Sequence, residues 1–212
     1  VGLSAMQSNT TGTANVAVGR CALFTNVTGG TNTAVGYNSL TLNTACCNTA
    51  VGYVSLTNNS SGINNSAMGH SALGGNTTGD NNTAFGSGAL DSNTTASANT
   101  AVGKSALGGN TTGTGNVALG NAMEQNTTGS NNTAAGNGAL QANTTASGNT
   151  AFGRIALASN TTGANNVGVG FCALRENTTG SGNTSVGACS LCHNTTASNN
   201  TAVGFCSLHE NT

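Results

Sequence analysis

The sequence contains almost no charge, few aromatic residues, and no proline or tryptophan. Of its 212 residues, 4% are charged and 3% are aromatic, and the formal net charge is −1. Four Lys or Arg residues provide no basic surface for DNA or RNA, so no nucleic-acid partner is expected. So few ionisable groups leave little for acid–base catalysis, and we expect no enzyme and no catalytic residues. No apolar run approaches the ~18 residues of a membrane helix, so neither a membrane span nor a signal peptide is expected.

Asn, Thr and Gly together fill 101 of the 212 positions, and they recur at a fixed spacing. A glycine returns every 17 residues, except for two intervals of 16 that end at Gly52 and Gly136. Numbered from that glycine, the unit reads G-x-x-A-L-x-x-N-T-T-G-x-x-N-T-A-V. Position 5 is Leu in eleven of thirteen units, position 8 is Asn in all thirteen, and position 14 is Asn in all twelve that reach it. Residues 1–212 are therefore predicted to form a single continuous repeat array.

A unit of this length is too short for two helices and a turn, and Gly, Asn and Thr oppose helix formation. The segment N-T-A-V-G suits a short strand instead. We predict an all-β protein, a parallel β-solenoid with one 16–17-residue unit per coil and about 12.5 coils. Equivalent positions then stack about 4.8 Å apart. Proline is absent because most backbone N–H groups are needed by a neighbouring coil.

Each recurrent position has a physical interpretation in such a stack. Leu at position 5 and the apolar residue at position 17 are predicted to form the ribs of a thin core. Gly at position 1 is predicted to have a positive φ, and Asn at positions 8 and 14 to lie in turns, where Asn tolerates left-handed geometry. The N-T-A-V-G strand is largely apolar on both faces, and a thin coil buries only one. The other face should therefore meet another chain, another layer or a second sheet of its own. This favours an oligomer or bundle, and we expect copies of the chain to associate, laterally or head to tail.

The two Asn columns admit two interpretations that exclude each other at any one column. Inward-facing amides would bond to the Asn above and below, whereas N-x-[ST] sequons in exposed turns would carry one glycan per coil. We assign position 14 to an internal Asn ladder, formed by Asn15, Asn32, Asn48, Asn65, Asn82, Asn99, Asn116, Asn132, Asn149, Asn166, Asn183 and Asn200. We assign position 8 to exposed turns with candidate N-glycosylation at Asn9, Asn26, Asn59, Asn76, Asn93, Asn110, Asn126, Asn143, Asn160, Asn177 and Asn194.

Cys172, Cys189 and Cys206 share position 3 in three successive units. Stacked coils bring such residues to about 5 Å, so this column is a candidate for an inter-coil disulfide, with free buried thiols as the alternative. Residues 189–193 also match the C-x-x-C-H pattern of haem attachment, but a thin coil has no room for a haem. Stacking places His209 above Cys192, which makes a zinc site conceivable. No metal site and no cofactor are nevertheless predicted.

The segments Asn32–Gly36 and Asn149–Gly153, which read N-T-A-V-G and N-T-A-F-G, resemble the S-V-A-I-G head repeats of trimeric autotransporter adhesins. They are also similar to repeat regions of phage tail fibres and other bacterial surface proteins. The resemblance implies a left-handed parallel β-roll, often trimeric, that serves as a stalk or binding rod on a cell or virion surface. A weaker similarity, in N-x-V-x-G spacing, links the chain to plant ice-binding β-rolls.

The sequence thus supports three functional hypotheses. The first is a structural protein: a self-associating, glycosylated extracellular fibre. Val1 and Thr212 fall at positions 17 and 9 of their units, without caps, which leads us to expect a segment of a longer fibre. The second is an adhesin or phage-fibre binding rod, and the third is an ice-binding β-solenoid.

Overall fold

The computed structural model describes residues 1–211, and within them the chain is an all-β parallel β-solenoid with about 17 residues per coil and no helix. The fold predicted from the repeat is therefore confirmed. About 11 turns are formed, fewer than the 12.5 repeat units, because a turn is complete only between two equivalent strands. Thr212, which entered the prediction about uncapped ends, lies outside the described residues.

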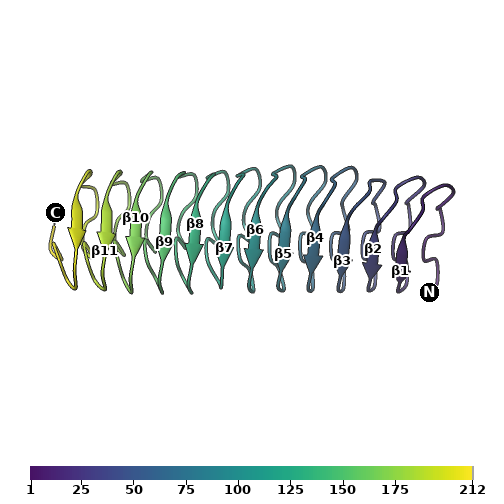
Figure 1. Ribbon diagram of the computed structural model, residues 1–212, viewed down its shortest axis with the longest axis horizontal. Coiled ribbons are helices and arrows are strands. Elements are labelled where there is room, and N and C mark those ends of the chain that lie inside the picture. The colour runs from purple at the N-terminus through teal and green to yellow at the C-terminus, as the bar shows by residue number, and fades with distance from the viewer. Residues whose placement is uncertain (212) are drawn as a thin grey trace. The chain divides into compact units, whose positions relative to one another are not determined.

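The chain divides into two compact units, Val1–Thr112 and Gly113–Thr212. Within each unit one short strand per coil joins a parallel sheet (Figure 1). The first unit contains β1 (Val16–Val18), β2 (Thr33–Val35), β3 (Thr49–Val51), β4 (Ser66–Met68), β5 (Thr83–Phe85) and β6 (Thr100–Val102). The second contains β7 (Val117–Leu119), β8 (Thr133–Ala135), β9 (Thr150–Phe152), β10 (Val167–Val169), β11 (Thr184–Val186) and β12 (Thr201–Val203). That residues 1–212 form one continuous array stays a prediction.

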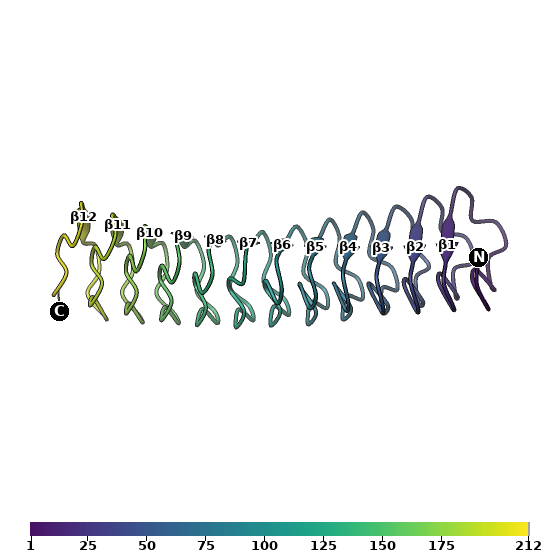
Figure 2. The same cartoon turned by 90° about the horizontal axis from the view of Figure 1, so that it is seen from below.

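Each strand is the T-A-V segment of its repeat, and equivalent positions pair between neighbours. Ala34 in β2 is opposite Ala50 in β3, and Thr33 and Val35 are opposite Thr49 and Val51. The two shortened units do not shift this register, because the missing residue is taken from a turn: Thr133 in β8 still faces Val117 in β7. Figure 2 shows the strands along one side of each coil and the remaining segments on the other.

The central strand residue faces inward and its two neighbours face outward. Ala84, at position 16, is completely buried, whereas Phe85, at position 17, keeps 37% of its surface exposed. The prediction that position 17 forms a core rib is therefore wrong. The core instead stacks the buried Ala of position 16 against Leu at position 5 and Ala or Ser at position 4, as in Leu90 and Ala89.

In the G-x-x-A-L segment that follows the strand, φ is positive at positions 1, 3 and 5 but not at positions 2 and 4. Gly86, at position 1, has φ of 138°, and a Cβ there would lie 2.3 Å from the carbonyl oxygen of Gly103. This confirms the predicted glycine corner. Position 3 also has positive φ, and so does the buried Leu at position 5, as in Leu90 with φ of 52°. A left-handed Leu costs about 1–2 kcal/mol, which burial of its side chain, worth about 1.5–3 kcal/mol, offsets.

This alternation directs the backbone N–H groups of one coil to both neighbours. The N–H groups of Gly103 and Ser105 donate to carbonyls of the preceding coil, and that of Leu90 donates to Ala106 in the following coil. Many positions outside the three-residue strands therefore donate backbone N–H groups to a neighbouring coil, and proline at any of them would remove a hydrogen bond. Asn at positions 8 and 14 does not adopt positive φ, contrary to our expectation; position 13, which includes Asn81 with φ of 58°, does.

Candidate functional site

Both predicted Asn columns lie in the interior. At position 14, the Oδ1 atom of Asn65 accepts the backbone N–H of Asn82 at 2.9 Å, and its Nδ2 donates to Gly79 O at 2.8 Å. The column thus clamps the side chain of one coil to the backbone of the next. The direct amide-to-amide ladder is more regular at position 8. There, Nδ2 of Asn76 donates to Oδ1 of Asn59 and Nδ2 of Asn93 donates to Oδ1 of Asn76.

This arrangement does not fit the glycan column that we assigned to position 8. Of the eleven sequon residues, all except Asn9 have no exposed surface. A glycan would have to be attached to Nδ2, the atom that donates both to the preceding Asn and to the backbone, as Asn76 does to Gly79 O at 3.0 Å. Burying an amide is favourable only when such bonds are made. The sequence N-x-T is the same whether the Asn is a buried turn residue or a glycosylation site. Only the burial of the Asn side chain in the structure distinguishes the two.

The three cysteines of the predicted column are stacked, and each is a free thiol in the structure. Cys172, Cys189 and Cys206 stack in successive coils of the second unit, and none of the seven cysteines is in a disulfide within residues 1–211. Burial raises the pKa of Cys172, and the neighbouring Cys189 adds to that effect. In the first unit, the hydroxyl of Thr31 lies 3.2 Å from Sγ of the exposed Cys47 and lowers its pKa. The predicted inter-coil disulfide stays a prediction.

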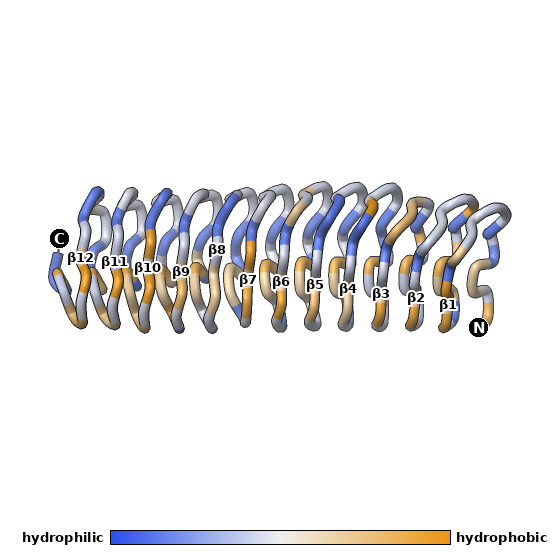
Figure 3. Tube along the Cα trace, viewed as in Figure 1, coloured by the Kyte–Doolittle hydropathy of each residue, from blue (hydrophilic) through white to orange (hydrophobic). Residues whose placement is uncertain are grey.

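Within each unit, the outward positions of the strands form two parallel rows on one face. We call the row of position 17 the apolar row; it comprises Val18, Val35, Val51, Met68, Phe85 and Val102 in the first unit and Leu119, Ala135, Phe152, Val169, Val186 and Val203 in the second. Met68 is 47% exposed and Phe152 44%. Beside it, position 15 presents Thr in most coils. Figure 3 shows the hydrophobic colour recurring at the strands of each unit.

Aromatic rings stack along position 2, beyond the glycine corner. In the first unit the rings of Tyr37 and Tyr53 lie 5.2 Å apart, and those of Tyr53 and His70 lie 5.3 Å apart. The guanidinium of Arg20 lies 5.7 Å from the centroid of the Tyr37 ring. Four successive coils thus share one continuous stack, which ties them together at the surface.

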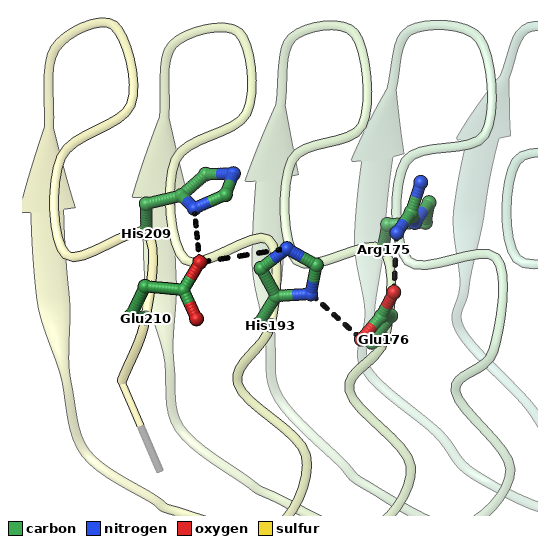
Figure 4. Close-up of polar contacts among 5 residues, drawn as sticks. All are labelled: Arg175, Glu176, His193, His209 and Glu210. Atoms are coloured by element: carbon green, nitrogen blue, oxygen red, sulfur yellow. Dashed lines mark hydrogen bonds and ion pairs between the residues drawn. The ribbon is translucent and has the colours of Figure 1, made fainter.

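A second cluster occupies positions 6 and 7 of three successive coils in the second unit. We call Arg175, Glu176, Cys192, His193, His209 and Glu210 the Cys192 cluster. Nδ1 of His193 lies 2.8 Å from Glu176, and its Nε2 lies 3.8 Å from Glu210. Figure 4 shows both imidazole rings next to the Glu210 carboxylate, each joined by a dashed line to the same oxygen. Hydrogen bonding from His193, reinforced by Arg175, lowers the pKa of Glu176.

The Cys192 cluster contains the residue types that bind transition metals. Cys192, His193 and His209 each offer one ligand atom, and these three atoms lie within 4.8 Å of one another. Residues 1–211 contain no pocket for a small molecule and no helix with the length and hydrophobicity of a transmembrane segment. No protein-family model, curated protein or solved structure shows a significant match to this chain.

Proposed function

We propose that this chain is a structural protein whose solenoid units associate with copies of themselves through the outer strand face. The observation that carries this proposal is the apolar row, which places one exposed or half-buried apolar side chain in each coil and contains no charged residue. Large exposed apolar surfaces on proteins mark association sites. Asn ladders and backbone bonds pair the interior of each unit, whereas the side chains of this row remain at least partly exposed.

A second copy of the chain is the partner that fits this row best. The side chains of the row recur once per coil, at the spacing of about 4.8 Å between paired strands. Another copy has the same period, so its side chains stay in register over six coils of a unit. A partner with a different repeat loses register after a few contacts. The absence of charge also means that two such rows meet without repulsion.

Sedimentation velocity over a range of concentrations tests the association. We expect the double variant Met68→Lys/Phe85→Lys to weaken self-association by about tenfold or more, because two charges per chain would have to be buried in the interface. The matched control is Ser61→Lys/Thr78→Lys, which adds the same charges to the same two repeat units at position 10, away from the strand face. Both Ser61 and Thr78 are exposed. A wild-type chain that stays monomeric, or equal weakening by both variants, contradicts the proposal.

The specific repeat type and its location belong to this proposal as well. The N-T-A-V-G segments support an assignment to the surface of a cell or virion, as in the adhesin and phage-fibre repeats that they resemble. In that setting the chain serves as a stalk or as the binding element itself. Chemical cross-linking followed by mass spectrometry distinguishes a trimer from other assemblies. Loss of surface attachment on deletion of residues 1–212 would favour the binding rod over the stalk.

Ice binding is the second candidate, because one specific feature favours it. Positions 15 and 17 both point outward, so strands such as Thr100–Val102 and Thr184–Val186 present Thr and Val in alternation on the same face. The adjacent Thr of positions 9 and 10 do not form this face; the hydroxyl at position 9 instead donates to the next coil, as Thr77 does to Thr94 O. Met68 and Phe85 interrupt the flatness of the row, which is why we rank association first. Absence of thermal hysteresis would eliminate this candidate.

A further inference from the structure

We propose that the Cys192 cluster binds a zinc ion, with Cys192, His193 and His209 as ligands and Glu210 as the fourth. Thiolate sulfur and imidazole nitrogen are the ligands that zinc prefers in four-coordinate protein sites. The site would join two successive coils of the second unit, because Cys192 and His193 come from one coil and His209 and Glu210 from the next.

The three nitrogen and sulfur atoms are already close to the spacing that zinc requires. They lie within 4.8 Å of one another. With Zn–N bonds of about 2.0–2.1 Å and a Zn–S bond of about 2.3 Å, tetrahedral ligand atoms are about 3.4–3.6 Å apart. Side-chain rotations that move each atom by about 1 Å close this difference. Cys192 is buried while both histidines keep 34% of their side-chain surface, so the site has a solvent path for the ion.

The carboxylate of Glu210 contacts a nitrogen of each imidazole ring through the same oxygen. Its Oε1 lies 3.0 Å from Nδ1 of His209 and 3.8 Å from Nε2 of His193 (Figure 4). The two ring nitrogens and the carboxylate oxygen on which they converge are three neighbouring ligand atoms of the kind that bind a cation. Glu210 is the most exposed member of the cluster, at 78% of its side chain, so it can rotate to become a ligand.

The other nitrogen of His193 has the partner that a metal-bound histidine requires. Nδ1 of His193 lies 2.8 Å from Oε2 of Glu176, and the other carboxylate oxygen of Glu176 is paired with Arg175. A carboxylate at Nδ1 fixes the ring and favours the tautomer whose Nε2 lone pair is free for the metal. Arg175 therefore acts as a positioning residue, since it holds the carboxylate that orients His193.

The repeat itself does not impose this combination of residues. In the other complete coils of the second unit, position 6 is Glu124, Gln141 or Ala158, and position 7 is Gln125, Ala142 or Ser159. Only Arg175–Glu176, Cys192–His193 and His209–Glu210 place charged or metal-binding groups at both positions in three successive coils. The same comparison identifies substitutions that the coil already accepts: Cys192→Ala, His193→Gln and His209→Gln each introduce a residue found at that position elsewhere.

Isothermal titration calorimetry with ZnCl2 and Co²⁺ absorption spectroscopy, on reduced, chelator-treated protein, test the proposal. We expect one Zn²⁺ per chain and a Co²⁺ complex with a thiolate charge-transfer band. Each of the three ligand variants should weaken Zn²⁺ binding roughly 100-fold or more, since one of four ligands is lost. Cys192→Ala should also abolish the charge-transfer band, and Glu176→Gln should weaken binding by about 10–100-fold through the orientation of His193.

Two controls separate this site from other ligands in the chain. His70→Gln changes a histidine of the first unit, and Cys172→Ser/Cys189→Ser/Cys206→Ser removes the cysteine column, where Ser71 and Ser105 show that Ser is accepted. Both proteins should bind Zn²⁺ as the wild type does, and circular dichroism in chelator should show that every variant keeps the wild-type β fold. Absence of saturable binding overturns the proposal. So does binding that survives the ligand variants but is lost with the cysteine column.

Discussion

Nδ2 of Asn143 donates a hydrogen bond to Oδ1 of Asn126 in the preceding coil at 2.7 Å, and neither side chain has any exposed surface. Asn143 also donates to Ala146 O in its own coil and accepts a bond from Asn160 in the following coil. One amide thereby joins three coils and closes its own turn. A column of such amides replaces the large apolar side chains that a wider core would contain.

Replacing one amide of this ladder should destabilise the second unit strongly. We expect Asn143→Ala to lower the free energy of unfolding by about 2–4 kcal/mol, because buried partners on both sides lose a bond. Asn137→Ala, six residues away in the same repeat unit, is the control; Asn137 is exposed, and its change should stay within about 0.5 kcal/mol. Urea denaturation monitored by circular dichroism measures both. Similar losses in the two variants would show that the ladder contributes nothing specific.

The glycine corner should tolerate no side chain. We expect Gly86→Ala to cost about 3 kcal/mol or more, because φ of 138° is strained for alanine and the Cβ would lie 2.3 Å from Gly103 O. Gly88, two residues later, has φ of 68°, and a Cβ added there would have no atom closer than 3.7 Å, so Gly88→Ala should cost only about 1–2 kcal/mol. Thermal unfolding of the two variants ranks them, and the reverse order would refute the steric argument.

Cys47 should be the most reactive thiol in the first unit at neutral pH. Its pKa is lowered, chiefly by the hydrogen bond with Thr31, so a larger fraction is thiolate at pH 7 than for an ordinary cysteine. The labelling rate should rise with pH and level off once pH exceeds that lowered pKa. Thr31→Ala, which introduces the residue found at Ala14 and Ala98 in the same position, should slow labelling at pH 7. Peptide mapping after a brief maleimide pulse measures the rate, and no change in Thr31→Ala would contradict this cause.

N-linked glycans should be absent from position 8 in the folded protein. Secretion from a host that glycosylates N-x-[ST] sequons offers the exposed Asn58, Asn64, Asn81, Asn131 and Asn199 as acceptors. We expect peptide mapping of the folded fraction to place any glycan on these residues, because a glycan on a position 8 Nδ2 removes a donor from the buried ladder. Glycan on Asn76 or Asn143 in folded, monodisperse protein would show that the buried ladder does not form.

Much of the fold could be predicted from the columns of the repeat. The glycine at position 1 needs a conformation that other residues avoid, so its recurrence revealed both the period and the corner. The inward Leu at position 5 followed from hydrophobicity alone. Position 17 could not be assigned in this way, because valine and phenylalanine suit a core and an exposed association face equally. The alternation along three-residue strands, with Ala151 buried between Thr150 and the 44% exposed Phe152, decided it.

The sequence by itself determined the parallel solenoid, its period of 16 or 17 residues and the absence of room for proline, because these follow from local geometry repeated in every unit. Only the tertiary structure decided that position 8 faces inward and position 17 outward. Asn is equally suited to an exposed turn and to a buried ladder, and the choice depends on whether the neighbouring coil supplies partners for its amide. The Cys192 cluster depends on stacking in the same way, since residues 16 or 17 positions apart meet only when coil lies on coil.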